Sequence, residues 1–197
     1  QQFGPKSALG KRRPRIGDAP VISEEAFEVL VEREPITVIC SAKGWIRAIK
    51  GHAADDGTAA FKEGDKGRFW LHAETTDKLL LFGTNGRAYT INCDKLPRGR
   101  GHGEPVRLMI DLGNDQDIVA LMKYQGDRRF MVASSDGRGF ICPEAEMLAA
   151  TRTGKQILNV QAPAEACVMT QVEGDTVAVI GDNRKLLLFP LADLPEM

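Results

Sequence analysis

Histidine is scarce in this sequence, and no group of residues has the spacing of a metal or catalytic site. The three histidines, His52, His72 and His102, stand 20 and 30 residues apart, which fits neither an HxxxH nor an HExxH zinc motif. The sequence has no GxSxG nucleophile elbow and no GxxxxGK[ST] phosphate-binding loop. We therefore expect no catalytic residues, no metal ligands and no cofactor in this chain.

Long apolar runs and closely spaced cysteines are also missing. No stretch approaches the roughly 18 to 20 apolar residues that a membrane span requires. Residues 1–15 are basic and polar with no apolar segment after them, so we expect no secretion signal and no membrane anchor. Cys40, Cys93, Cys142 and Cys167 form no CxxC pair, and three of them lie in apolar runs. This pattern predicts reduced thiols and a cytoplasmic location.

The sequence also lacks an excess of charge of either sign. Lysine and arginine number 26 against 27 aspartate and glutamate residues, and the net charge is −1. This balance excludes a uniformly basic nucleic-acid binder but allows a local basic patch.

Residues 1–34 combine proline and glycine with a Ser-Glu-Glu start at position 23 that predicts a short helix through Leu30. We interpret residues 1–34 as a linker or lead-in and residues 35–197 as the folded domain.

What the sequence does contain is an internal repeat of short apolar runs broken by tight turns. The four copies are residues 36–49, 78–91, 129–142 and 176–189. Their turns align at Gly44, Gly86, Gly137 and Arg184, which are 42, 51 and 47 residues apart. Each copy predicts a β-hairpin, because Asn-Gly and Asp-Gly supply the positive φ that such turns require.

Further strand candidates lie between the hairpins, so each repeat holds about four strands. The candidates are residues 67–73, 106–112, 117–123, 156–160 and 166–171. Four strands in a period of this length are typical of propeller-type blades, which predicts an all-β array of about four blades. An irregular β-sandwich with chance similarity between hairpins is the alternative. The fourth copy is followed almost directly by Met197, so we expect the chain to be a fragment of a longer protein.

Positive charge recurs with the repeat. The position after the turn carries Arg87, Arg138 and Lys185 in three copies and Trp45 in the first. Two glycine-containing loops, residues 98–103 and 152–155, are basic as well, and small residues let their backbone approach a phosphate. The predicted phosphate contacts are Lys43, Arg47, Lys50, Arg87, Arg98, Arg100, Arg138, Arg152 and Lys155. Such contacts predict electrostatic, largely sequence-independent binding of double-stranded DNA, although turn cations are often plain solvated surface.

Several of these runs also match a known family. Residues 34–52, which end in Gly-Trp-Ile-Arg-Ala-Ile-Lys-Gly-His, resemble the first blade of the C-terminal domain of bacterial topoisomerase IV A subunits, as does the Phe-Lys-Glu-Gly-Asp run at 61–65. Residues 96–105, 135–142 and 188–195 are similar to later parts of that domain. The resemblance covers about residues 34–195.

The resemblance implies a β-pinwheel, which is a propeller-like array whose blades exchange strands and whose basic outer edge binds DNA. It implies a domain that engages and bends the transported DNA segment and tunes topology preference in supercoil relaxation and decatenation, and so acts in chromosome segregation. DNA cleavage and magnesium would belong to other domains of the enzyme, and ATP hydrolysis to its B subunit. The implied partners are DNA, a second A subunit and the B subunit.

One segment departs from the related gyrase A subunit. Gyrase carries a basic, glycine-rich heptapeptide in its first blade, whereas residues 51–57 here, Gly-His-Ala-Ala-Asp-Asp-Gly, contain two acids and no lysine or arginine. This difference favours the topoisomerase IV type. One other function stays open from the residues alone, a propeller-like platform for protein partners. An enzyme with its site at the centre of the array would need convergent polar residues, which the sequence does not show.

Overall fold

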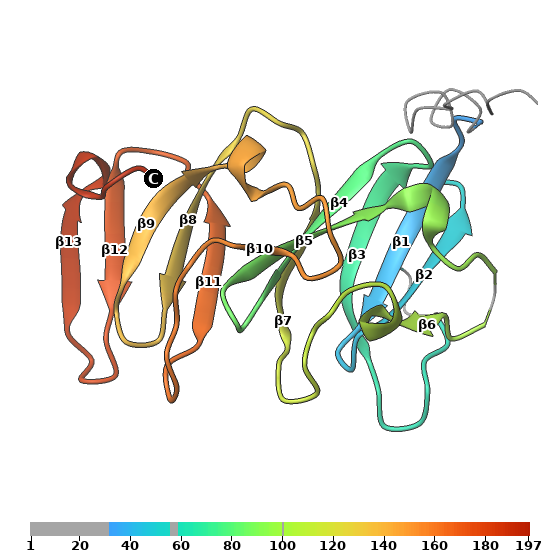
Figure 1. The fold of residues 1–197 in the computed structure, drawn as a ribbon, viewed down its shortest axis with the longest axis horizontal. Coiled ribbons are helices and arrows are strands. Elements are labelled where there is room, and N and C mark those ends of the chain that lie inside the picture. Colours follow the sequence, from blue (N-terminus) through green and yellow to red (C-terminus); the bar gives the residue numbers. More distant parts are fainter. Residues whose placement is uncertain (1–31, 56–58, 100) are drawn as a thin grey trace, which may run out of the picture. The chain divides into compact units, whose positions relative to one another are not determined.

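The computed structural model describes residues 32–55, 59–99 and 101–197, and in these ranges every regular element is a strand or a short 3-10 turn (Figure 1). The strands are β1 Pro35–Ser41, β2 Trp45–Lys50, β3 Gly67–Glu74, β4 Lys78–Gly83, β5 Arg87–Asn92, β6 Glu104–Pro105, β7 Ile118–Lys123, β8 Arg129–Ser134, β9 Gly139–Pro143, β10 Lys155–Gln156, β11 Ala166–Gln171, β12 Thr176–Ile180 and β13 Leu186–Pro190. The 3-10 turns are η1 Cys93–Lys95, η2 Val106–Leu108, η3 Glu144–Met147 and η4 Leu191–Asp193. The helix expected within residues 23–30 lies outside the described residues.

The four expected hairpins are all present, as β1–β2, β4–β5, β8–β9 and β12–β13. Their turns share one geometry: Gly44, Gly86 and Gly137 have φ of 78°, 72° and 84°, and Arg184 has φ of 61°. In each turn the amide at this position donates a hydrogen bond to the carbonyl three residues earlier. The left-handed conformation explains why glycine stands at three of the four positions. The repeat predicted from the sequence is therefore a structural repeat.

Each of the first two hairpins lies inside a four-stranded antiparallel sheet, which we call a blade. The strand orders are β3-β1-β2-β6 and β10-β5-β4-β7. The strand beside β2 is β6, which follows the second hairpin, and the strand beside β5 is β10, which follows the third. Each of these two blades is thus completed by a strand from beyond the next hairpin. This exchange confirms the β-pinwheel arrangement.

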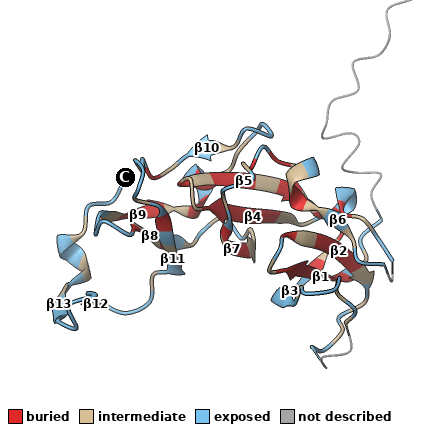
Figure 2. Ribbon diagram, turned by 90° about the horizontal axis from the view of Figure 1, so that it is seen from below, coloured by how far each residue is buried: buried red, intermediate tan, exposed pale blue. Residues whose placement is uncertain are grey.

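The core is built by hairpin residues that are buried on both faces of their sheet. In β4, Leu79 and Leu81 belong to a cluster with residues of β1 and β2, whereas Leu80 and Phe82 belong to a cluster with residues of β8 and β9. Burial on both faces explains why β4 is a continuous apolar run instead of an alternating one. Figure 2 shows β4 largely as buried residues.

The fourth hairpin differs from the others. Strands β12 and β13 form a two-stranded sheet with no further strand among the described residues. Their apolar side chains are mostly exposed, with Ile180 75% exposed and Leu186, Leu187 and Leu188 all close to 60% (58%, 59% and 59%). The pale colour of this hairpin in Figure 2 reflects that exposure.

Two of the strand predictions were wrong in detail. Residues 106–112 begin with the 3-10 turn η2, because the Met109 amide donates to the Val106 carbonyl and the chain turns away from a sheet. Residues 156–160 hold only the end of β10, because the amides of Ile157 and Leu158 both converge on the Gly86 carbonyl. Val106, Ile110, Leu112 and Leu158 are buried all the same, although Leu108 is exposed, so burial alone did not distinguish strand from turn.

The four cysteines are free thiols. Cys40, Cys93 and Cys142 are buried and Cys167 is exposed. Burial raises the pKa of Cys40 and of Cys93 to about 12 and also raises the pKa of Cys142. These three thiols are therefore protonated and unreactive at neutral pH.

In the part of the chain that the structure describes, no helix has both the length and the apolar character of a membrane span.

Candidate nucleic-acid interface

The first basic loop, residues 98–103, is attached along the outer edge of β2. The Ala48 amide donates to the Pro97 carbonyl at 2.9 Å, and the Gly99 amide donates back to the Ala48 carbonyl at 3.3 Å. The chain then turns and pairs with β2 again through β6. This double attachment holds Arg98 at the edge of the first blade. Arg100, which the sequence also predicted as a contact, lies outside the described residues.

Arg47 lies beneath this loop and not on the surface. Only 6% of the residue is exposed, and its guanidinium donates to the Gly101 carbonyl. The guanidinium also lies 5.8 Å from the centre of the Phe61 ring. Arg47 therefore positions the loop that carries Arg98, whereas the sequence pattern predicted a direct phosphate contact.

Lys50 and Arg98 come together on one carboxylate. Lys50 Nζ lies 2.8 Å from Glu34 Oε1, and Arg98 Nη1 lies 3.4 Å from Glu34 Oε2. The hydrogen bond from Lys50 and the charges of Lys50 and Arg98 lower the pKa of Glu34, so this carboxylate is ionised at neutral pH. Both cations are nevertheless well exposed, which leaves them open to a second anion.

The second basic loop is attached along β5 in the same way. Lys155 and Gln156 pair with Ala88 and Arg87, and Arg87 Nη1 donates to the carbonyl of Thr153 at 2.8 Å. Arg87 thus holds the second loop through a backbone carbonyl, as Arg47 holds the first loop.

Two exposed cations of the second loop contact residues outside the loop. Arg152 Nη2 donates to the Leu108 carbonyl at 2.6 Å, and Lys155 Nζ pairs with Glu146 at 2.9 Å. The structure therefore brings together Arg87, Arg152 and Lys155 at the edge of the second blade, as it brings together Arg47, Lys50 and Arg98 at the first.

The remaining predicted cations lie at hairpin turns. Arg138 projects from the third turn with its side chain 76% exposed, and its Nε lies 3.2 Å from Asp136. Lys43 is exposed at the first turn, where its amide donates to Asp65. Neither residue is in one of the two loop groups.

The sequence pattern missed Lys62. Trp45 stands where the other repeats carry a cation, and Lys62 Nζ lies 3.4 Å from the centre of the Trp45 ring. A lysine from the segment before β3 thus places a positive charge at the position that the first repeat lacks. The aromatic residue at a recurring cation position was the available signal, because the face of an indole attracts a cation.

Known proteins resemble the chain along its whole length. The family model described as the DNA gyrase C-terminal domain, a β-propeller, matches residues 77–124 and 129–167. The chain is 48% identical over 98% of its length to the A subunit of DNA topoisomerase 4 from Caulobacter vibrioides, and 40% identical over 100% of its length to that from Rickettsia conorii. Among solved structures, the C-terminal domain of Escherichia coli ParC matches with a TM-score of 0.77 and 28% identity, over 83% of this chain and 68% of that one.

The chain belongs to the family of C-terminal domains of gyrase and topoisomerase IV A subunits. It spans 26% and 27% of the two curated relatives, so it corresponds to about a quarter of each. The matched family segments run from just before β4 into β11, and they include both the second blade and the loop that holds Arg152. The identity to the A subunits of topoisomerase IV extends over the first blade as well, in agreement with the resemblance of residues 34–52.

Proposed function

We propose that this chain is a non-catalytic DNA-binding and DNA-bending domain of a type IIA topoisomerase, of the topoisomerase IV A-subunit type. The observation that supports this most is the attachment of a cation-bearing loop at the same place in two successive blades. Arg47 and Arg87 each donate to a backbone carbonyl of one loop, so both loops and their exposed cations are held at the edges of their blades. Recurring cations suit the regular spacing of phosphates along a DNA backbone.

The acidic partners of these cations are compatible with such binding. The pairs with Glu34, Glu146 and Asp136 all include well exposed side chains. Exposed pairs of this kind contribute about 0 to 1 kcal/mol, so a phosphate can replace the carboxylate at small cost. Nothing in the pattern of cations reads base edges, and the proposed binding is sequence-independent.

In the whole protein, we propose that this domain engages the transported DNA segment and tunes topology preference during supercoil relaxation and decatenation. Strand cleavage with magnesium would take place in other domains of the A subunit, and ATP hydrolysis in the B subunit. The partners of the whole protein would be a second A subunit and the B subunit, in the cytoplasm of a bacterium.

Fluorescence anisotropy of a labelled duplex of about 40 base pairs tests the DNA-binding proposal. If about six phosphates are contacted, affinity falls about a thousandfold between 50 and 200 mM salt, and two unrelated sequences bind alike. Replacing Arg98 and Arg152 together by alanine weakens binding and lowers the salt slope. Lys95→Ala, an exposed cation outside both loops, serves as the control and leaves binding unchanged.

Absence of binding at low salt would instead favour a platform for protein partners. The observation that favours this second function is the exposed apolar surface of β12 and β13. DNA binding that depends strongly on sequence would contradict both the electrostatic mechanism and the choice of contacts.

A further inference from the structure

The second basic loop packs against the ring of Tyr89. This tyrosine lies in β5 and is 0% exposed. A Cβ on Gly154 would lie 2.7 Å from Cδ1 of the tyrosine ring and 2.7 Å from the Ala88 carbonyl oxygen. The backbone of the loop therefore lies directly on the ring, with no room for a side chain between them.

The hydroxyl of Tyr89 reaches a second segment that contacts the same loop. It donates to the Asp111 carbonyl at 3.2 Å and accepts a hydrogen bond from Asn85 Nδ2 at 2.8 Å. The Asp111 amide donates to the Arg152 carbonyl at 2.9 Å, and Arg152 Nη2 donates to the Leu108 carbonyl at 2.6 Å. The hydroxyl thus fixes a segment that holds both the backbone and the guanidinium of Arg152.

The first blade uses the equivalent position to support its own basic loop. Arg47 and Tyr89 each stand three residues after the turn glycine of their hairpin. A Cβ on Gly103 would lie 2.2 Å from the Ile46 carbonyl oxygen and 3.0 Å from Cβ of Arg47, so a loop glycine again packs on this residue and the one before it. Arg47 also donates to the Gly101 carbonyl of that loop. A buried side chain with a hydrogen-bonding group therefore supports the loop in both blades.

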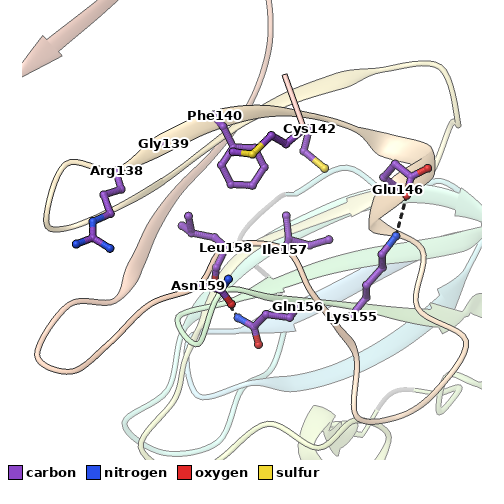
Figure 3. Close-up of a pocket in the computed structure, with 11 residues that line it drawn as sticks. Arg138, Gly139, Phe140, Cys142, Glu146, Lys155, Gln156, Ile157, Leu158 and Asn159 are labelled. Atoms are coloured by element: carbon purple, nitrogen blue, oxygen red, sulfur yellow. Dashed lines mark hydrogen bonds and ion pairs between the residues drawn. The ribbon is translucent and has the colours of Figure 1, made fainter. Parts of the chain in front are cut away.

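The third hairpin carries Phe140 at this position, and its side chain has no hydrogen-bonding atom. Phe140 lines a cavity of about 510 Å³ together with Leu158 and Asn159 (Figure 3). The two basic loops lie at the first and second hairpins. A polar side chain thus occupies this position in the two hairpins that carry a basic loop.

We propose that Tyr89 is a positioning residue of the DNA interface, which holds Arg152 towards the phosphate backbone through the Asp111 segment. The inference rests on the proposed function, because it gives Tyr89 a part in the proposed DNA binding. Arg152 is a long side chain that is 61% exposed, and ordering such a side chain and its loop on binding costs free energy. A loop that is already fixed lowers this cost, so Tyr89 contributes to DNA affinity without touching DNA.

The test removes the hydroxyl and leaves every charge in place. Anisotropy titrations of the same labelled duplex at three salt concentrations compare the natural chain with Tyr89→Phe. We expect a few-fold loss of affinity and a salt slope that is lower by about one, because one phosphate contact is lost. Tyr124→Phe removes the hydroxyl of the only other tyrosine in the chain and leaves the slope unchanged.

Arg152→Ala separates positioning from a general effect on stability. If Tyr89 acts through Arg152, Tyr89→Phe has no further effect on the slope or the affinity once Arg152 is replaced by alanine. A merely structural role would lower the affinity by the same factor in both backgrounds, and that result would overturn the proposal. An unchanged slope for Tyr89→Phe in the otherwise natural chain would overturn it as well.

Gly154→Ala is a second variant that keeps every cation. Its Cβ would meet the Tyr89 ring and the Ala88 carbonyl oxygen, so the loop has to move, and the slope falls as it does for Tyr89→Phe. Gly174→Ala is the matched control, because Gly174 has a similar φ of 80° and a Cβ there would meet nothing within 4 Å. Hydrogen exchange over residues 79–82 reports that each variant is folded. A folded Gly154→Ala chain with an unchanged slope would overturn the proposal.

The proposed function and the role of Tyr89 fail in different ways. If the natural chain does not bind the duplex at low salt, the proposed function is wrong and the role of Tyr89 is overturned with it. If the natural chain binds with a steep salt slope and Tyr89→Phe keeps that slope, DNA binding stands and only the role of Tyr89 is overturned.

Discussion

Among single residues, Glu144 carries the most buried charge of the described chain. Its side chain is 0% exposed and accepts hydrogen bonds from Arg128 Nη2 at 2.6 Å, from the Gly126 amide at 2.7 Å and from the Gln125 amide. Burial raises the pKa of this carboxyl, but the hydrogen bonds from Arg128 and the two amides outweigh it, and the pKa lies below its ordinary value. The carboxylate thus joins β9 to the turn before β8.

Replacing Glu144 by glutamine is expected to destabilise the domain by about 3 kcal/mol at pH 7, because it leaves Arg128 without its charged partner. Since the folded pKa is lowered, the stabilisation is present above the unfolded value near 4.5 and is lost as pH falls through the folded pKa. Urea unfolding between pH 7 and pH 3 should therefore show a larger loss of stability in acid for the natural chain than for Glu144→Gln. The exposed Glu63→Gln serves as control, and an unchanged midpoint for Glu144→Gln would contradict this role.

Lys62 gives a test of the interface at the first blade. If its ammonium, held over Trp45, contacts a phosphate, Lys62→Ala lowers the salt slope of DNA binding by about one, with a few-fold loss of affinity. Anisotropy titrations at three salt concentrations measure this slope. Lys62→Arg retains the cation and should keep the slope, whereas identical slopes for the alanine variant and the natural chain would remove Lys62 from the interface.

At the scale of elements, the turn of each hairpin is coupled to a strand far away in the sequence. The sequence predicts all four turns from their glycine, asparagine and aspartate residues, because that chemistry is local. It does not predict that Gly86 is pressed against Leu158, since 72 residues separate the two and only the exchanged strand brings them together. For the same reason the sequence does not predict the burial of Arg47, because the loop that covers it follows in the next repeat.

This coupling makes two chemically identical substitutions unequal. Gly137→Ala is expected to cost about 1 kcal/mol, the penalty of a side chain at positive φ with open space around it. Gly86→Ala carries the same penalty plus a 1.9 Å approach to a backbone oxygen, and is expected to cost about 3 kcal/mol. The two urea midpoints give the comparison. Equal costs would mean that the backbone at Leu158 moves aside easily and does not constrain the turn.

Across the whole molecule, stability is expected to fall towards the fourth hairpin. Strands β12 and β13 pair only with each other among the described residues, whereas β4 lies inside a four-stranded sheet that is buried on both faces. An isolated two-stranded hairpin is marginal in water. Amides of residues 176–180 should therefore exchange with deuterium far faster than those of residues 79–82 in one sample. Comparable protection of the two segments would indicate that something covers the fourth hairpin in solution.

The sequence by itself determined the period, the four hairpins and the absence of the familiar catalytic motifs, because these depend on residues close together in the chain. It also identified the family, through runs such as residues 44–52. Only the tertiary structure decided which cations are open, since Arg47 and Arg87 are used to hold loops that arrive from later repeats. The strand exchange was likewise decided only in three dimensions, because β6 and β10 reach β2 and β5 from later repeats and no local pattern specifies these partners.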